Sequence, residues 1–486
     1  MDLSFERIFH PRRVAVAGVS TDGFGFGRGI LLSLLEMGFE GELFPVNPRG
    51  GEIKGLKIYP AIEDIPGEID FAVIAVAAEA VPETLAACRR KGAAGAEILS
   101  SGFRETGTEK GAALEEAVRV EAARGIRVIG PNCFGIYCPK SGLTMLPGPD
   151  LSRETGPVAF VSQSGGHAID LAFLGKAVGI RFSKMISFGN GVDLRETELL
   201  KYLTTDPETG VIAMYLEGVT DGDAFFRALD EATRKKPVVI YKGGLSEAGQ
   251  RAVASHTASM GGQALIWESI LRQAGAVQTA SMDELAGACL ALSLLPRRPY
   301  RGVTVVGGGG ALGVAACDTA EAYGLQLPPL TGEIFEAVQA VLPKPGSSAA
   351  NPIDIANPYV PPQTLEKALT AAGRDERVDI QIMVPLLYHF KALAAMLGLP
   401  SIKEATPYEA MAEAGARAAA ATGKPVCAVL PNPRRTLADL DVEVILREAR
   451  DSFLKRSIPV FSSLAEAFSA VRHAARAARR LEGDPD

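Results

Sequence analysis

Residues 14–38 read VAVAGVSTDGFGFGRGILLSLLEMG. A short β-branched run comes first, a glycine-rich turn follows it, and a run with helical spacing follows the turn. The same order returns at residues 158–175, VAFVSQSGGHAIDLAFLG, and at residues 303–324, VTVVGGGGALGVAACDTAEAYG. Strand, turn and helix in this order are typical of parallel sheets covered by helices. The sequence therefore predicts an α/β protein with three such units.

Two breaks rich in proline and glycine separate the units, at residues 139–157 and 296–302. We expect domains over residues 1–138, 156–296 and 302–482, which fits the usual size of roughly 100–200 residues per domain. A long irregular stretch, residues 342–362, lies inside the third unit, and stretches of this length are usually functional or mobile. The predicted strands are residues 13–19, 42–46, 70–76, 96–99, 127–129, 158–161, 181–187, 211–216, 238–241, 303–306, 380–385, 426–430 and 460–461.

The composition excludes several classes of protein. The 486 residues carry a net charge of -7, so the chain lacks the basic surface on which nucleic-acid binding depends. The six cysteines form no C-x-x-C pair and no metal-ligand cluster, which favours reduced thiols and no metal site. The N-terminus has no apolar signal region, and the apolar runs are far shorter than the ~20 residues that span a bilayer. We expect a soluble cytoplasmic protein that binds neither nucleic acid nor membrane.

The glycine-rich turns point to phosphate chemistry. Each would leave free backbone N–H groups at a helix N-terminus, where the helix dipole favours an anion and glycine allows close approach. One such turn is weak evidence because glycine often serves only the turn, but three in one chain favour a phosphate ligand.

A dinucleotide is a poor candidate for the first turn. The run after Gly18 does not give G-x-G-x-x-G, and the second predicted strand ends in Asn47 where an acidic residue would hold the ribose hydroxyls. An NAD(P)-dependent oxidoreductase is therefore disfavoured, although another nucleotide-bearing ligand is compatible. The chain also contains no G-x-x-x-x-G-K-[ST] phosphate loop.

Motifs along most of the chain resemble one known family. In order, these are GRGILLSLLEMGFEGELFPVNPRGG, SSGFRETG, GPNCFGIY, VSQSGG, SFGNGVD, YLEG, YKGG, SHTASMGG, GGGGALG and NPIDI. They resemble the α-type subunit of NDP-forming (ADP-forming) acyl-CoA synthetases, relatives of succinyl-CoA synthetase. The resemblance implies a Rossmann-like CoA-binding domain followed by two flavodoxin-like, succinyl-CoA-synthetase-like domains. It also implies reversible conversion of acyl-CoA, phosphate and NDP into carboxylic acid, CoA and NTP through an acyl phosphate and a phosphohistidine.

The resemblance assigns the catalytic roles to His256 and Glu217. His256 matches the phosphorylated histidine of the family, and a neutral imidazole with an ordinary pKa of about 6.5 is a competent nucleophile near neutral pH. Glu217 follows an apolar strand and is expected to orient the far nitrogen of His256. His167 is expected to be structural, and Cys133 is expected to be a small buried thiol without a nearby base.

The resemblance also assigns the ligand contacts. Phosphate is expected at Ser164, Gly165 and Gly166, and at a second position formed by Gly308, Gly309 and Gly310. CoA is expected at Gly18, Ser20, Gly25, Gly27, Val46, Asn47, Pro48, Lys54, Ser100, Gly102 and Asn132. Lys54 could meet a CoA phosphate as a point charge, or it could be an ordinary solvated lysine.

The three units use the whole chain, so an ATP-grasp domain is missing. We therefore expect ATP or ADP and Mg²⁺ on a separate ATP-grasp β-type subunit, in a heterodimer or an α2β2 complex, with a small carboxylic acid as the other substrate. A catalytically silent CoA-binding regulatory protein remains the alternative. The acyl group, the choice between ADP and GDP, and the physiological direction stay open.

Overall fold

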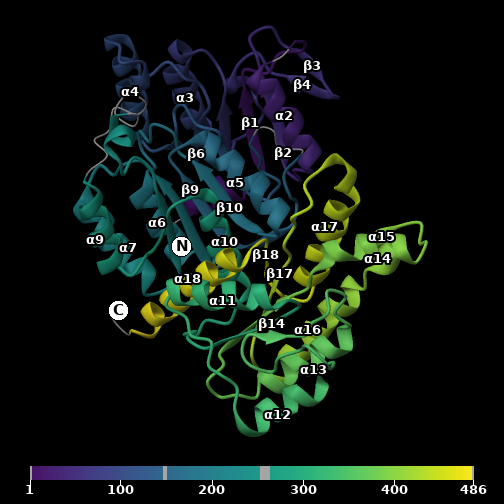
Figure 1. The fold of residues 1–486 in the computed structure, drawn as a ribbon. Helices are drawn as coiled ribbons and strands as arrows, with labels where there is room; N and C mark the ends of the chain where they lie inside the picture. Colours follow the sequence, from purple (N-terminus) through teal and green to yellow (C-terminus); the bar gives the residue numbers. More distant parts are fainter. Residues whose placement is uncertain (1–2, 24, 146–149, 252–262, 484–486) are drawn as a thin grey trace. The chain divides into compact units, whose positions relative to one another are not determined.

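The computed structural model describes residues 3–23, 25–145, 150–251 and 263–483. The chain divides into two compact units, residues 1–285 and 286–486. The first unit contains two sheets and a small hairpin, and the second contains one sheet. The sheets are largely parallel and carry helices on their faces (Figure 1), which confirms the predicted α/β class.

The first sheet has five parallel strands in the order β2-β1-β5-β6-β7. Both neighbours of β1 come later in the chain, so the strand order reverses there and opens a crevice at the carboxyl ends of the strands. Helices α3 and α4 pack against each other, and α2 packs on β1. The strands are β1 (Arg13–Ala17), β2 (Glu42–Val46), β5 (Phe71–Ile74), β6 (Gly95–Ile98) and β7 (Arg127–Ile129); the helices are α1 (Leu3–Phe9), α2 (Phe26–Met37), α3 (Val81–Arg90) and α4 (Glu109–Ala122); the hairpin is β3 (Gly51–Ile53) and β4 (Leu56–Ile58).

The second sheet has six strands in the order β13-β12-β11-β9-β10-β8. Its edge strand β8 is antiparallel to β10, although β8 precedes the first proline-rich break and the sequence placed it with the first unit's domain. The strands are β8 (Gly135–Tyr137), β9 (Thr155–Ser162), β10 (Phe182–Ser187), β11 (Val211–Leu216), β12 (Val238–Lys242) and β13 (Val277–Thr279); the helices are α5 (Gly165–Val178), α6 (Glu196–Thr205), α7 (Gly222–Thr233) and α9 (Ala264–Gln273). Helix α10 (Met282–Leu294) begins in the first unit and continues into the second.

One apolar core connects the two sheets of the first unit. It includes Ile30 and Leu34 of α2 together with Ile186 of β10, Leu200 of α6 and Met214 of β11, all nearly or fully buried. A separate core lies where α3 and α4 cover the other face of the first sheet. Because apolar burial is the main stabilising term in folding, the shared core fixes the strand ends of the two sheets relative to each other.

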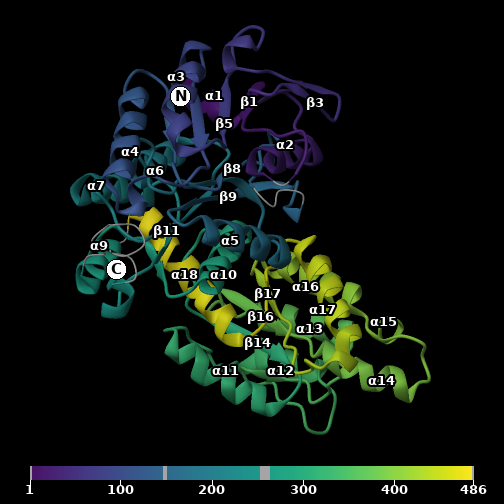
Figure 2. The ribbon, with the colours of Figure 1, turned by 90° about the horizontal axis from the view of Figure 1, so that it is seen from above.

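The second unit has one parallel sheet in the order β15-β14-β16-β17-β18. Helices α11 and α18 pack together on one face, whereas α12, α13, α16 and α17 pack in series on the other (Figure 2). Strand β15 lies inside the stretch expected to be irregular. The strands are β14 (Val303–Gly307), β15 (Ile353–Asp354), β16 (Ile380–Val384), β17 (Val426–Val429) and β18 (Val460–Phe461); the helices are α11 (Gly310–Ala322), α12 (Gly332–Val341), α13 (Pro362–Ala372), α14 (Phe390–Met396), α15 (Ile402–Ala405), α16 (Tyr408–Thr422), α17 (Leu440–Leu454) and α18 (Leu464–Glu482).

None of the helices in the described part of the chain is both long enough and apolar enough to cross a membrane.

Candidate functional site

The first glycine-rich turn brings the start of α2 close to neighbouring strand ends. Gly18 has φ +93°, and a Cβ there would lie 2.2 Å from the carbonyl oxygen of Ala75. A Cβ at Gly27 would lie 2.5 Å from the carbonyl oxygen of Gly18, so both glycines are required for packing. Gly25 differs, because the nearest atom to a Cβ there is Ser20 Oγ at 3.8 Å. A Cβ at Gly25 would therefore meet no close contact among the described residues other than its chain neighbours.

The end of β2 forms a polar turn. Asn47 N–H donates to the carbonyl of Tyr59 at 2.9 Å, and Asn47 Oδ1 accepts from Arg49 N–H at 3.0 Å. This Asx turn shapes the predicted contact segment Val46–Pro48. Lys54 is exposed at the tip of the β3–β4 hairpin, with φ +51°. The structure thus uses the Asn47 side chain within the turn and leaves Lys54 on the surface.

Three successive strands of the first sheet are joined at their carboxyl ends. Asn132 N–H donates to the carbonyl of Ser100 at 2.9 Å, and Ser100 Oγ donates to the carbonyl of Val76. Gly102, with φ +112°, donates its N–H to Glu105 Oε1 at 2.6 Å. These bonds hold the predicted CoA contacts Ser100, Gly102 and Asn132 in one connected loop cluster.

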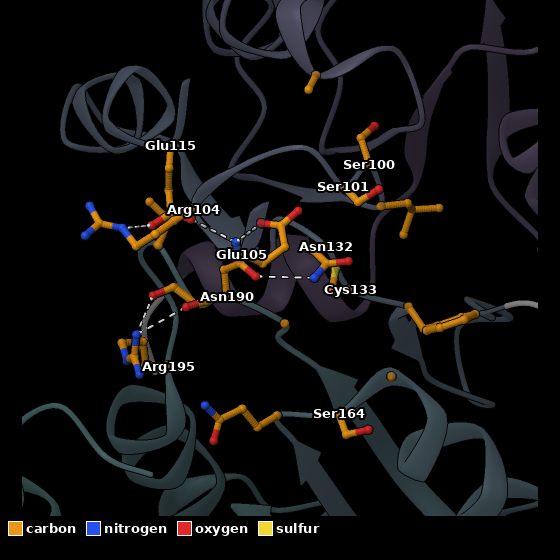
Figure 3. A pocket seen from close by; sticks show the side chains of 18 of the residues that line it. Ser100, Ser101, Arg104, Glu105, Glu115, Asn132, Cys133, Ser164, Asn190 and Arg195 are labelled. Carbon is orange, nitrogen blue, oxygen red and sulfur yellow. Dashed lines mark hydrogen bonds and ion pairs between the residues drawn. The ribbon is translucent and has the colours of Figure 1, made fainter. Parts of the chain in front are cut away.

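A cavity of about 1200 Å³ lies in the first unit, at the carboxyl ends of the strands (Figure 3). The first sheet contributes Ala75–Ala78 and Leu99–Ser101 to its wall. The second sheet contributes Gln163–Gly166, Gly189–Val192 and Gly218–Thr220. The cavity is larger than most small-molecule sites, which measure roughly 300–1,000 Å³. It therefore has room for a large ligand that contacts both sheets.

The N-terminus of α5 opens into this cavity. Ser164 is the N-cap residue, and its Oγ accepts a hydrogen bond from His167 N–H at 3.4 Å. Gly165 packs on the ring of Phe134, where a Cβ would lie 2.1 Å from Cδ2, whereas Gly166 is exposed. Free backbone N–H groups and the helix dipole favour an anion at such an end. The fold thus brings the predicted phosphate residues Ser164–Gly166 to the same cavity as Ser100 and Asn132.

Glu217 lies just behind the cavity wall, at the end of β11, and is 7% exposed. Gln163 Oε1 accepts hydrogen bonds from Glu217 N–H at 2.8 Å and from Gly218 N–H at 3.2 Å. Tyr215 donates its hydroxyl to Glu217 Oε1 at 3.3 Å. Burial raises the pKa of Tyr215, with the Glu217 carboxylate adding to the effect. The backbone of Glu217 is therefore tied to Gln163, which precedes α5, and its carboxylate accepts a hydrogen bond from Tyr215.

Lys242 connects the ends of β11 and β12. Its buried Nζ donates to the carbonyl of Glu217 at 2.9 Å and to the carbonyl of Gly243, and it lies 5.0 Å from the ring centroid of Trp267. Burial lowers its pKa to about 8, against the opposing attraction of Glu217. The ammonium thus fixes the point at which the chain leaves β12 toward His256. His256 itself lies outside the described residues.

Two family models match consecutive parts of the chain. Residues 12–139 match a CoA binding domain, and residues 155–292 match a succinyl-CoA ligase like flavodoxin domain. The α subunit of the ADP-forming acetate–CoA ligase I of Pyrococcus furiosus is 37% identical over 361 residues, which cover 73% of this chain and 77% of that subunit. The chain belongs to the family of ADP-forming acyl-CoA synthetase α subunits. This confirms the resemblance found in the sequence.

Other members of the acyl-CoA synthetase family agree with this assignment. The ADP-forming acetate–CoA ligase I of Archaeoglobus fulgidus is 36% identical over 380 residues, 78% of this chain and 54% of that protein. The chain thus spans about half the length of this relative. The structure of acetyl-coenzyme A synthetase 1 from Ca. Korarchaeum cryptofilum, in complex with phosphate and ADP, matches with 30% identity, a TM-score of 0.83 and 99% coverage of both chains.

A polar network that the sequence did not reveal lines one side of the synthetase cavity (Figure 3). Asn190 Nδ2 donates to Glu105 Oε2 at 2.6 Å and to Glu115 Oε2 at 2.8 Å, and Asn132 Nδ2 donates to Asn190 Oδ1 at 3.4 Å. Burial opposes ionisation of Glu105, but bonds from Asn190 and nearby backbone N–H groups outweigh it and hold the pKa of Glu105 below its usual value. Arg195 joins this network from the start of α6. The only sequence signal for these residues is that SFGNGVD directly follows a strand, at the edge where α/β sites lie.

The second unit holds the other predicted phosphate turn. Gly309 N–H, ahead of α11, donates to Asp354 Oδ1 at 2.8 Å, and Ala356 N–H donates to the same oxygen at 2.7 Å. A Cβ at Gly308 would lie 2.7 Å from the carbonyl oxygen of Asn357, so the turn is closely packed on one side. A carboxylate therefore already caps the helix that begins at Gly310.

The structure places Cys133 in the cavity wall and His167 in the first turn of α5. Cys133 is 6% exposed, its thiol donates to the carbonyl of Ile98 at 3.3 Å, and burial raises its pKa. A thiol that resists ionisation is a poor nucleophile. The ring of His167 packs edge-on against Tyr215, with centroids 4.3 Å apart.

Proposed function

We propose that the chain is the α-type subunit of an ADP-forming acyl-CoA synthetase. It would interconvert acyl-CoA, phosphate and ADP with carboxylic acid, CoA and ATP. One observation carries this proposal: a single cavity gathers the strand ends of the CoA binding domain and the N-terminus of α5. A thioester and a phosphate could therefore meet within one site.

The first step would form an acyl phosphate. A phosphate oxygen attacks the thioester carbonyl, the C–O bond forms, the C–S bond breaks, and the CoA thiolate leaves and takes up a proton. Backbone N–H groups of Ser164–Gly166 would hold the phosphate, since donors already aimed at an anion need no reorganisation during the reaction. Ser100, Gly102, Asn132 and the open face of Gly25 would contact CoA, with Gly18, Ser20, Gly27, Val46–Pro48 and Lys54 around them.

The second step would phosphorylate His256. A ring nitrogen attacks phosphorus, the P–N bond forms, the P–O bond to the acyl group breaks, and the carboxylate leaves. Glu217 would accept a hydrogen bond from the other ring nitrogen and stabilise its positive charge. The bond from its backbone N–H to Gln163, which precedes α5, and the bond from Tyr215 to its carboxylate support this role.

The third step would pass the phosphoryl group to ADP on another subunit: an oxygen of the terminal phosphate of ADP attacks phosphorus, the new P–O bond forms, the P–N bond breaks, and the neutral imidazole is released. Relatives named as α subunits support a partner. We propose an ATP-grasp β-type subunit that binds ADP or ATP and Mg²⁺, with the turn at Gly308–Gly310 serving the phosphate at a second position. Asp354 would have to release Gly309 N–H there. We keep the domain ranges 1–138, 156–296 and 302–482 as part of the proposal.

Phosphate labelling tests this proposal. The full-length chain is incubated with an acyl-CoA and radiolabelled phosphate, and acid-labile, base-stable label on His256 is the expected result. The His256→Ala variant should lose the label and keep CoA binding. Tight CoA binding by the wild-type chain without any label, across a panel of acyl-CoAs and with the partner present, would instead indicate a silent CoA-binding regulatory protein.

A further inference from the structure

Three arginines line the cavity, and two of them are neutralised at its rim. Arg104 pairs with Glu115 at 2.9 Å, and Arg119 pairs with Glu116; both arginine side chains are 60% exposed. An exposed arginine that already pairs with a carboxylate attracts a further anion only weakly, because water screens its charge. The charges of Arg104 and Arg119 are therefore poorly placed to hold an anion inside the cavity.

Arg195 is more deeply placed and more rigidly held. Its side chain is 27% exposed, and its Nη1 donates to the carbonyls of Asn190 at 3.2 Å and Gly191 at 3.1 Å (Figure 3). These two bonds fix the plane of the guanidinium. Within the described residues no acceptor is bonded to Nη2, so this nitrogen keeps its donors available to a ligand.

The counter-ion of Arg195 is weak. Glu196 Oε2 lies 3.4 Å from Arg195 Nε, and the described residues provide no hydrogen bond to that Nε. Glu196 is 1% exposed, and burial raises its pKa despite the neighbouring guanidinium. The positive charge of Arg195 is thus less well compensated than that of the two rim arginines.

The topology brings Arg195 and the start of α5 to the same cavity. Strand β9 leads into α5 and lies between β10 and β11 in the sheet. Arg195 ends the segment that follows β10, and Thr220 lies on the segment that follows β11; both line the cavity together with Gly165 and Gly166. A guanidinium and a helix N-terminus on one cavity favour the same ligand charge.

We propose that Arg195 is an anion-binding residue of this cavity, with Nη2 donating to an anionic oxygen of the ligand. The inference rests on the proposed function for the ligand's identity. The oxygen would belong either to the reacting phosphate or to a carboxylate at the far end of the acyl chain. A planar guanidinium binds both groups well because it offers parallel N–H donors.

Equilibrium binding tests the inference without any turnover. The full-length chain and its Arg195→Met variant are titrated calorimetrically with inorganic phosphate, with butyryl-CoA and with succinyl-CoA, which differ in the terminal carboxylate. If phosphate is the source, the variant binds phosphate at least tenfold more weakly and keeps the ratio of the two thioester affinities. If the acyl carboxylate is the source, the preference for succinyl-CoA falls at least tenfold. Changes below fivefold in both measurements overturn the inference.

Two further variants complete the design. Arg195→Lys keeps the charge and should restore part of the lost affinity, and Arg195→Gln replaces Arg195→Met if the latter does not fold. Arg234 is a matched control, because it is 60% exposed and pairs with Asp230 on α7. Arg234→Met should leave all three affinities unchanged. The Arg195 variants could weaken binding as expected while the wild-type chain never becomes labelled on His256. In that case the anion site stands, and the proposed reaction is excluded.

Discussion

The side chain of Gln163 fixes the backbone of Glu217 across two neighbouring strands. Gln163 follows β9 and Glu217 follows β11, and Gln163 Oε1 accepts the N–H of Glu217 at 2.8 Å. The two residues are 8% and 7% exposed. An amide at the start of the phosphate turn thus positions the backbone of the residue whose carboxylate is proposed to orient His256.

Replacing this amide should therefore disturb both stability and phosphorylation. In Gln163→Met the N–H groups of Glu217 and Gly218 lose their acceptor while staying buried, which costs about 1–3 kcal/mol. We expect a loss of that size in chemical denaturation and slower labelling of His256. An unfolding free energy within about 0.5 kcal/mol of the wild type would contradict the assigned role.

Glu97 should make the stability of the protein fall as the pH rises. This carboxyl on β6 is 2% exposed, and burial raises its pKa from 4.5 to about 8, although Ile136 N–H donates to it at 2.9 Å. Between these two values the unfolded chain ionises while the folded chain keeps its proton, so folding is weakened as the pH rises. Below pH 4.5 the effect is absent, and above pH 8 it is complete.

The Glu97→Gln variant removes this titration and keeps an acceptor for Ile136 N–H. Its stability relative to the wild type should increase from pH 4.5 to pH 8 by on the order of 4 kcal/mol. Denaturation curves across this range measure the difference. The exposed residue Glu40 provides the control, and Glu40→Gln should give a difference that does not depend on pH. A pH-independent difference for Glu97→Gln as well would exclude the buried acid as its cause.

The sequence predicted the buried strands well because their apolar runs are continuous. Residues 42–46, 127–129 and 211–216 were predicted with the bounds that the structure has. Parallel strands are covered on both faces, so pattern alone reveals them. Strands β3, β4, β8, β13 and β15 were not predicted, because each depends on pairing with neighbouring strands and carries little apolar pattern of its own.

The site was only partly predictable for the same reason. Glycine-rich turns are visible in the sequence itself, so the turn at the start of α5 was predicted from it. Asn190, Arg195 and Gln163 owe their roles to strands that meet only in the folded sheet, and single residues after a strand carry no pattern. The hydrogen bond from Gly309 N–H to the Asp354 carboxylate likewise forms only because β15 pairs with β14.

A buried ion cluster should contribute strongly to the first unit. Lys184 on β10 is fully buried, and its Nζ lies 2.6 Å from Asp206 Oδ2 and 3.0 Å from Glu208 Oε2. The ammonium also lies over the ring of Phe9 at 5.4 Å, which links α1 to the second sheet. Lys184→Met leaves a buried carboxylate without its partner, so we expect a loss of about 3–5 kcal/mol in unfolding free energy.

The double variant Lys184→Met, Asp206→Leu provides the control for this cluster. Replacing both partners with apolar groups should recover a large part of the loss, because the unpaired buried charge is then gone. If the single variant loses less than about 1 kcal/mol, or the double variant is no more stable than the single, the ion pair does not have the assigned energetic role.

Two glycines at the first turn should separate packing from ligand contact. A Cβ at Gly27 would lie 2.5 Å from the carbonyl oxygen of Gly18, so Gly27→Ala must displace α2. A Cβ at Gly25 meets nothing closer than Ser20 Oγ at 3.8 Å, and its φ of -155° suits any residue.

Gly27→Ala should therefore lower the melting temperature and weaken CoA binding together. Gly25→Ala should melt like the wild type and bind CoA at least tenfold more weakly, because the added methyl would enter space that the proposed CoA contact at Gly25 requires. Calorimetric titration with CoA and thermal unfolding of both variants measure the two effects. Unchanged CoA affinity in a stably folded Gly25→Ala chain would remove the first turn from the CoA site and leave it a purely structural feature.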